Sequence, residues 1–198
     1  MKPAAKAQLE PREPSSDERL IALCREGDPQ AWADLVDKYK NLIYSIPIKL
    51  GMYDDAADIF QSVCLDLLSG LSKLREPRAL PKWLMQVCYH KCLEHGARAK
   101  KQVQLEDEDA ENLPADSSAS PLPEEMLAQL QREQMVRDVV SVLPARCGQM
   151  VHMLFYETPP RPYQEIAQEL GIATGSIGFI RGRCLSRLKK QLEKMGFQ

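Results

Sequence analysis

The stretch YQEIAQELGIATGSIGFIRGRCLSRLKK, residues 163–190, decides the architecture predicted for the C-terminal half of the chain. Its first part repeats apolar residues at the spacing of one helical face, namely Tyr163, Ile166, Ala167 and Leu170. Gly171 follows the last of them and can adopt the left-handed conformation that ends a helix. Thr174 can cap a second helix, which begins near Gly175 or Ser176. Two helices joined by so short a turn are typical of a helix-turn-helix.

The second helix of this motif combines an apolar stripe with a basic face. The stripe consists of Ile177, Ile180, Cys184, Leu188 and Leu192. Between residues 175 and 194, six lysines and arginines and one glutamate leave a local charge of +5, whereas the whole chain carries −2. The pattern favours a recognition helix that enters the major groove of DNA. The candidate DNA contacts are Ser176, Phe179, Arg181, Arg183 and Arg187. A basic surface helix in an ordinary bundle is the simpler alternative.

Composition limits the compartment and the chemistry. The chain has 198 residues, enough for one large or two small domains. Its N-terminal residues have no apolar core of the kind found in signal peptides, and no run approaches the roughly 20 apolar residues that cross a bilayer. We therefore expect a cytoplasmic protein whose six scattered cysteines are reduced core residues. Cys88, Cys92 and His95 share a helix face, but a closed zinc site takes four ligands. With no fourth in view, we predict neither metal nor cofactor.

The order of polar and apolar segments predicts an all-α fold. Two small helical domains, residues 17–101 and 124–198, are joined by a flexible acidic linker, residues 102–123, which holds six Asp and Glu and no Lys or Arg. Residues 1–16 are expected to be a disordered tail. Four local signals refine the helices of the first domain: a capping box at Ser15 with Glu18, a cap at Asp28, a kink or break at Pro47 and a start at Asp54 or Asp55.

Five segments, taken in order, resemble the bacterial RNA polymerase sigma factors of the extracytoplasmic-function (ECF) group of the sigma-70 family. In the first domain they are LIALCREGDPQAWADLVDKY, DAADIFQSVCLDLL and LPKWLMQVCYHKCLEHGARAKK. In the second they are LPARCGQMVHMLFYE and YQEIAQELGIATGSI. The resemblance covers about residues 17–196. It implies a subunit that binds core polymerase, recognises and melts promoter DNA, and has no catalysis of its own.

The resemblance also implies site residues and partners. The helix spanning 55–68 would dock on the clamp coiled coil of the polymerase β′ subunit through Asp58, Gln61 and Asp66, and the second domain would meet the β flap. The loop 72–81 and the next helix would capture the −10 element through Lys73, Leu74, Arg75, Trp83, Tyr89, His90, Lys91, Arg98 and Lys100. Trp83 is equally compatible with a core position. The recognition helix would read the −35 element, the linker would occupy the RNA channel, and an anti-sigma factor would be a further partner.

Several residues depart from the family pattern. Gly178, Phe179 and Ile180 stand where basic or small polar residues are common, and His90 replaces an asparagine. Leu68 replaces a tryptophan, and the run TPPRP, residues 158–162, replaces a shorter turn. Two alternatives therefore stay open: a stand-alone helix-turn-helix regulator, and an inactive sigma-like interaction protein. An enzyme is disfavoured, because no phosphate loop, HExxH motif or nucleophile–base spacing is present.

Overall fold

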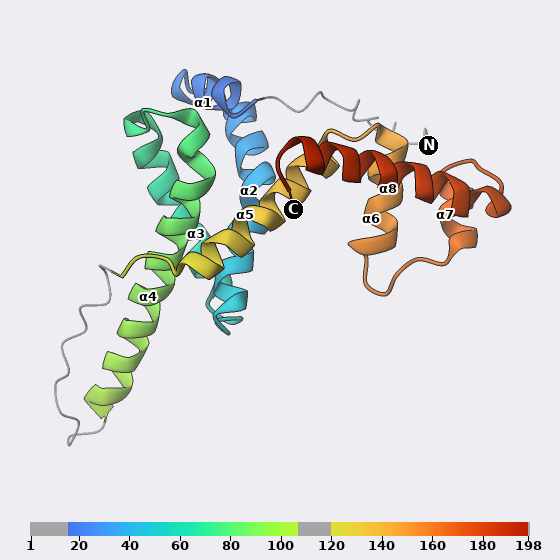
Figure 1. Cartoon of the computed structure of the whole chain (residues 1–198). Helices are drawn as coiled ribbons and strands as arrows, with labels where there is room; N and C mark the ends of the chain where they lie inside the picture. The colour runs from blue at the N-terminus through green and yellow to red at the C-terminus, as the bar shows by residue number, and fades with distance from the viewer. Residues whose placement is uncertain (1–15, 107–119, 198) are drawn as a thin grey trace, which may run out of the picture. The chain divides into compact units, whose positions relative to one another are not determined.

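The computed structural model describes residues 16–106 and 120–197. Every regular element in these ranges is a helix, eight α-helices and three short 3-10 helices, which confirms the all-α prediction (Figure 1). The helices form two compact units, residues 16–131 and residues 132–197. The predicted tail, apart from residue 16, and most of the predicted linker lie outside the described residues. Within the described ranges, no helix is both long and apolar enough to cross a membrane.

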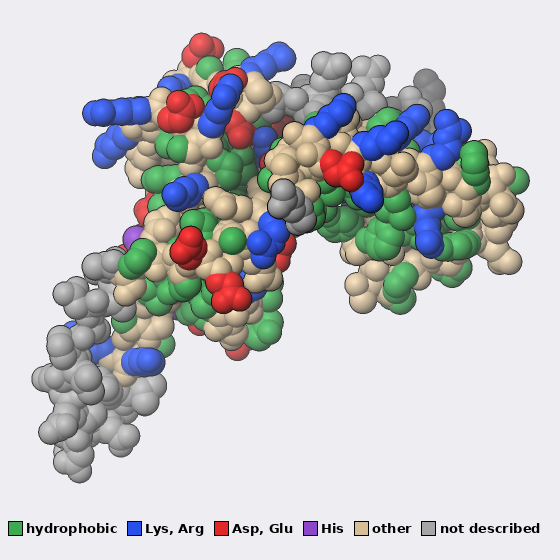
Figure 2. Space-filling view, viewed as in Figure 1, with side chains coloured by type: hydrophobic (Ala, Val, Ile, Leu, Met, Phe, Trp, Pro, Cys, Tyr) green, Lys and Arg blue, Asp and Glu red, His purple; other side chains and the backbone are tan. Residues whose placement is uncertain are grey.

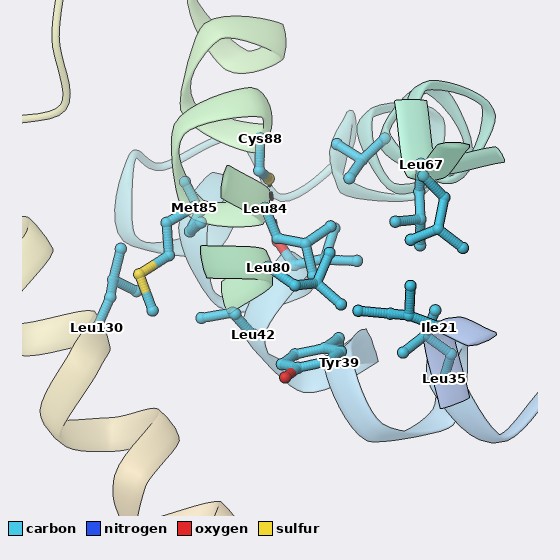
Figure 3. Packing of buried hydrophobic residues seen from close by; sticks show 14 of the residues in the cluster. Ile21, Leu35, Tyr39, Leu42, Leu67, Leu80, Leu84, Met85, Cys88 and Leu130 are labelled. Carbon is cyan, nitrogen blue, oxygen red and sulfur yellow. Dashed lines mark hydrogen bonds between the residues drawn. The ribbon is translucent and has the colours of Figure 1, made fainter. Parts of the chain in front are cut away.

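The first unit is built from four helices and two 3-10 turns. They are α1 (Asp17–Arg25), α2 (Pro29–Lys49), α3 (Ala56–Gly70), η1 (Leu71–Lys73), η2 (Pro77–Ala79) and α4 (Leu80–Glu106). Apolar side chains of all four helices converge on one core, and Tyr39, Leu42, Leu67 and Leu84 are completely buried (Figure 3). The hydroxyl of Tyr39 donates a hydrogen bond to Asp17 Oδ2 at 2.8 Å, so the one polar atom of this ring is satisfied at the rim of the core.

The sequence predicts a kink or a break at Pro47, and the structure has no break there. The helix continues to Lys49, with Pro47 buried inside it. A proline has no N–H, so the carbonyl of Ile43 loses the helical donor that lies four residues further on. The thiol of Cys88 on α4 approaches this carbonyl at 3.3 Å and donates to it. A side chain from the neighbouring helix thus satisfies the orphaned acceptor, and the helix persists.

The helix starts follow the predicted signals only in part. Asp28 caps α2, accepting from the backbone N–H of Gln30 at 2.8 Å. The cap of α1 is Ser16 rather than Ser15, with its side chain accepting from Arg19 N–H at 3.4 Å. Asp55 precedes α3 without a side-chain cap bond. Neighbouring serines and aspartates offer the same chemistry, so a sequence pattern cannot choose the register between them.

The boundary between the units differs from the predicted linker. α4 continues to Glu106, so the first residues of that linker are helical. α5 (Glu124–Ser141) is divided between residues 131 and 132. Leu122 and Leu130 are buried in the first core, where Leu130 lies beside Met85 (Figure 3). The first turns of the helix assigned to the second domain therefore complete the core of the first.

The second unit contains the rest of α5 and three further helices, α6 (Ala145–Phe155), α7 (Tyr163–Glu169) and α8 (Ile177–Lys194), with the 3-10 turn η3 (Thr174–Ser176) before α8. Gly171 has φ +61°, which confirms the predicted left-handed turn. Neither Thr174 nor Ser176 forms a side-chain cap bond, so the predicted Thr174 cap is wrong. Cys147 of α6 and Cys184 of α8 form a disulfide, which corrects the expectation that all cysteines are reduced.

Candidate nucleic-acid interfaces and docking face

A cleft of about 390 Å³ lies between the end of α3 and the start of α4 in the first unit. Its lining residues are Asp66, Ser69, Gly70, Lys73, Leu74, Arg75 and Trp83. Four of these, Lys73, Leu74, Arg75 and Trp83, belong to the predicted −10 set, and the structure brings them together around one space. The cleft offers a flat aromatic ring, on which an unstacked base can lie, and two cations, which can bind its phosphate.

Trp83 combines the two roles that the sequence leaves open. Its ring packs against the first core and also forms a wall of the cleft. A Cβ atom added at Gly70 would lie 3.0 Å from the Trp83 ring atom Cζ2. The glycine therefore lets the indole lie directly on the α3 backbone, and any larger side chain there would push the ring away. Sequence reasoning missed Gly70, because only the packing of α3 against α4 reveals this contact.

Arg25 fixes the loop that carries Lys73, Leu74 and Arg75. Its guanidinium donates to the carbonyl of Leu71 at 3.0 Å and also to the carbonyl of Leu74. These carbonyls follow the end of α3, where helical partners are missing. A charged donor from α1 thus holds the cleft loop against the body of the unit. Sequence reasoning missed this residue too, because Arg25 lies nearly fifty positions away from its partners.

We expect Arg25→Ala to loosen the loop without unfolding the unit. Hydrogen bonds to charged donors contribute about 1.5–3 kcal/mol each, and α1 keeps its apolar anchors in the core. Hydrogen exchange of the amides of residues 72–76 should accelerate, while exchange in α2 stays slow. Arg19→Ala, which removes an exposed cation of the same helix, is the matched control. Unchanged exchange in the loop would show that Arg25 does not position it.

Lys91 and Asp66 are paired in the structure, although they belong to different predicted sets. Lys91 Nζ lies 3.1 Å from Asp66 Oδ2 and 3.5 Å from Glu94 Oε2. The carboxylate of Asp66 is the main cause that raises the pKa of Lys91. In this structure Asp66 therefore faces α4 and the cleft rather than the outer face of α3. Its predicted polymerase contact would require the ion pair to rearrange.

The remaining predicted −10 residues lie along α4. Tyr89 and His90 are half-buried, and His90 Nε2 lies 2.9 Å from Gln86 Nε2 and 3.2 Å from the carbonyl oxygen of Ser120. Arg98 and Lys100 are exposed near the end of the helix, where Arg98 lies 4.0 Å from Glu94. Tyr89 and His90 are therefore partly covered by other parts of the first unit, whereas Arg98 and Lys100 are accessible to solvent.

The outer face of α3 carries an amphipathic stripe. Asp58, Gln61, Leu65 and Leu68 follow one another at helical spacing, and all four are exposed. Leu65 and Leu68 retain 67% and 59% of their accessible surface, unusual values for leucines on a helix whose opposite face is fully buried. Two of the predicted polymerase contacts, Asp58 and Gln61, share this stripe, which is the candidate docking face. Leu65 was not among the predicted contacts, and Leu68 was noted only as the residue that replaces a tryptophan of the family pattern.

The predicted −35 residues lie on the solvent side of α8. Ser176, Phe179, Arg181, Arg183 and Arg187 are all exposed, and Figure 2 shows lysines and arginines gathered along this helix. The Arg183 guanidinium lies over the Phe179 ring, 5.6 Å from its centroid. Arg181 instead donates to the hydroxyl of Tyr163 on α7. Tyr163 is exposed and bonds to α8, which corrects its predicted place on the buried face.

Comparison with known proteins finds similarity over most of the chain. No family model matches it. The ECF RNA polymerase sigma factor SigW of Bacillus subtilis (strain 168) is 24% identical over 183 residues, covering 89% of this chain and 97% of that protein. The ECF RNA polymerase sigma factor SigD of Mycobacterium tuberculosis (strain H37Rv) is also 24% identical, over 199 residues that cover 96% of this chain and 91% of that protein. Both alignments therefore include the two helical units.

Proposed function

The chain belongs to the ECF group of the sigma-70 family, and we propose that it binds core RNA polymerase, directs it to a specific set of promoters and assists in melting them. The observation that carries this proposal is that the alignments span both units, not the helix-turn-helix alone. A protein that used only the C-terminal motif would need neither the docking face of α3 nor the cleft. The proposed role has no catalysis of its own and belongs to the compartment that holds the polymerase, the cytoplasm.

The docking face of α3 supports a helical partner on the polymerase, for which we propose the β′ clamp coiled coil. Exposed leucines provide the apolar area that is removed from water on binding. Asp58 and Gln61 beside them provide polar groups that can select a basic partner surface. We propose that the second unit contacts the β flap and that an anti-sigma factor, where one exists, competes for these same surfaces.

The cleft supports the capture of one base of the −10 element on the non-template strand. A base that leaves its stack loses a few kcal/mol, which new stacking and phosphate contacts must offset. The indole of Trp83 offers about 1–3 kcal/mol of stacking per base. Lys73 and Arg75 are exposed at the mouth of the cleft and can neutralise the adjoining phosphates. Arg98 and Lys100 extend this positive path along α4.

For the −35 element we propose that Arg183 and Phe179 read adjacent base pairs. Arginine edges bind guanine O6 and N7 in the major groove, and apolar side chains contact the methyl group of thymine. With its guanidinium lying over the Phe179 ring, Arg183 is restrained before it meets DNA. Phe179, 69% exposed, has no partner among the buried residues of the second core. We therefore propose that the element contains a thymine beside a guanine.

We expect Arg183→Ala to weaken binding to the −35 duplex by about 1–3 kcal/mol. Replacing the thymine by uracil removes only the methyl group and should weaken wild-type binding about fourfold. The same replacement should leave binding by Phe179→Ala unchanged, because the contact is already absent. Fluorescence anisotropy with labelled thymine and uracil duplexes measures these affinities, and Lys194→Ala is the control for loss of a cation on the same helix. An equal uracil effect in wild type and Phe179→Ala would exclude Phe179 as the reader.

The proposal as a whole is tested by transcription. Purified core polymerase, this protein and fragmented genomic DNA of the source bacterium are combined, and the 5′ ends of the RNA are sequenced. We expect discrete starts that share two upstream motifs and vanish when the protein is omitted. Stable binding to core polymerase without such starts would favour the inactive sigma-like protein. DNA binding without any binding to core polymerase would favour the stand-alone regulator.

A further inference from the structure

The disulfide of the second unit joins α6 to α8, the helix that carries the proposed DNA contacts. Cys147 lies in the first turn of α6, and Cys184 lies in the middle of α8, 37 residues further on, with 5.3 Å between the Cα atoms. Both residues are buried, at 6% and 2% exposure, within the second core. Cys24, Cys64, Cys88 and Cys92 are free thiols, and all four belong to the first unit. Within the described chain, the covalent link is therefore confined to the helix-turn-helix unit.

Few other contacts hold α8 in place. Among its 18 residues, only Ile177 and Cys184 are buried. Ile180 and Leu188 pack against the same core but stay partly exposed. Cys184 is also the immediate neighbour of Arg183, which is exposed to solvent. The disulfide thus supplies one of the two buried anchors of the helix that carries the proposed DNA contacts.

We propose that the Cys147–Cys184 pair is a redox modification site, whose disulfide form fixes α8 on α6 for promoter binding and whose dithiol form loosens it. The inference rests on the proposed function, because that function places the protein in a reducing compartment. Disulfides that form in such compartments are usually transient or redox-sensing rather than permanent. A purely structural disulfide would add no lasting stability in a reducing compartment, because that compartment tends to reduce it.

The reaction partner is a dithiol on reduction and a disulfide on oxidation. In reduction, a thiolate of the dithiol attacks one sulfur of the pair, and the Sγ–Sγ bond breaks as a mixed disulfide forms. The second thiol of the reductant then displaces the protein sulfur. Two electrons and two protons pass to Cys147 and Cys184, and the reductant leaves as its own disulfide. Oxidation by a low-molecular-weight disulfide, such as oxidised glutathione, runs through the same steps in reverse.

Burial makes the exchange conditional on opening of the second unit. An attacking thiolate must reach a sulfur, and neither Cys147 nor Cys184 exposes enough surface for direct approach. The second unit can open without the first, because its core contains fewer buried side chains and so costs less free energy to expose. Promoter DNA bound to α8 would hinder opening and protect the disulfide.

The experiment compares the full-length protein after equilibration with oxidised glutathione and after treatment with dithiothreitol. Alkylation after unfolding, counted by mass spectrometry, should find four thiols in the first sample and all six in the second. Reduction should lower the melting temperature of the second unit by roughly 10 °C or more. It should also accelerate hydrogen exchange in α8 and weaken binding to the −35 duplex by roughly tenfold. Six alkylated thiols in the oxidised sample, or equal DNA affinity in both samples, would overturn the inference.

Variants separate this site from general effects of the reductant. Cys64→Ser, which removes a half-buried free thiol of the first unit, should respond to reduction as wild type does. The double variant Cys147→Ala/Cys184→Ala should show the DNA affinity of the reduced protein under both conditions. Should that variant fail to fold, the comparison of the two wild-type samples still decides the question. The thiol count and the hydrogen exchange in α8 need neither polymerase nor promoter. They therefore test the redox site even if the proposed function is wrong.

Discussion

Replacing Leu65 and Leu68 by alanine is expected to reduce affinity for core polymerase by roughly 150-fold or more while leaving the fold intact, because each leucine contributes about 1.5–3 kcal/mol when it is buried on binding. Both side chains are exposed in the free protein, so their removal opens no cavity in the core. The charge reversal Asp58→Lys should weaken binding further, since it places a cation against the basic partner expected for this face.

Titration of fluorescently labelled protein with core polymerase measures the effect, and circular dichroism checks that the helix content is kept. Met195→Ala removes an exposed apolar side chain from the other unit and serves as the matched control. If the double variant binds core polymerase as tightly as wild type, the stripe on α3 is not the docking face. A loss that is equally large for Met195→Ala would point to a general effect of apolar surface instead.

Replacing Trp83 by leucine is expected to impair promoter melting by roughly 5- to 150-fold, the equivalent of about 1–3 kcal/mol of base stacking. Leucine retains an apolar side chain against the core, so the first unit should stay folded. Alanine would be less informative, because truncating a tryptophan in a core costs about 3–5 kcal/mol in its own right. Trp83→Phe keeps a flat ring in the cleft and should melt promoters nearly as well as wild type.

The measurement is the rate of open-complex formation, followed by a fluorescent base analogue in the −10 element. Binding of the closed duplex and of core polymerase should be unchanged in all three proteins. Melting at the wild-type rate by Trp83→Leu would show that the indole serves the core alone. A defect shared by Trp83→Phe would instead indicate that the shape of the indole, rather than its flat face, is required.

Local sequence signals predicted the parts of the fold that depend on interactions between residues close together in the chain. The apolar spacing in residues 163–190 and the glycine at 171 define the two helices and the turn, and the structure contains both. The exposed positions of Phe179 and Arg183 follow from the same periodicity. Where the chemistry of a site is carried by consecutive turns of one helix, reading the sequence is sufficient to propose it.

Contacts between distant segments account for what the sequence could not reveal. Where α2 continues past Pro47, the thiol of Cys88 donates a hydrogen bond to a carbonyl of α2. The position of the cleft loop depends on hydrogen bonds from the guanidinium of Arg25. α5 shows no single apolar stripe, because its first turns pack on one core and its later turns on another. The pairing of Cys147 with Cys184 was hidden for the same reason, since each cysteine alone resembles a small core residue.

The central claim is that this one chain couples polymerase binding to the opening of promoter DNA. Permanganate reactivity of thymines around a transcription start, on a promoter found by the sequencing experiment, tests it most directly. We expect reactive thymines in and just downstream of the −10 element only when protein and core polymerase are both present. Thymines that stay unreactive in that mixture, while the protein alone binds the duplex with the same affinity as the mixture, would contradict it.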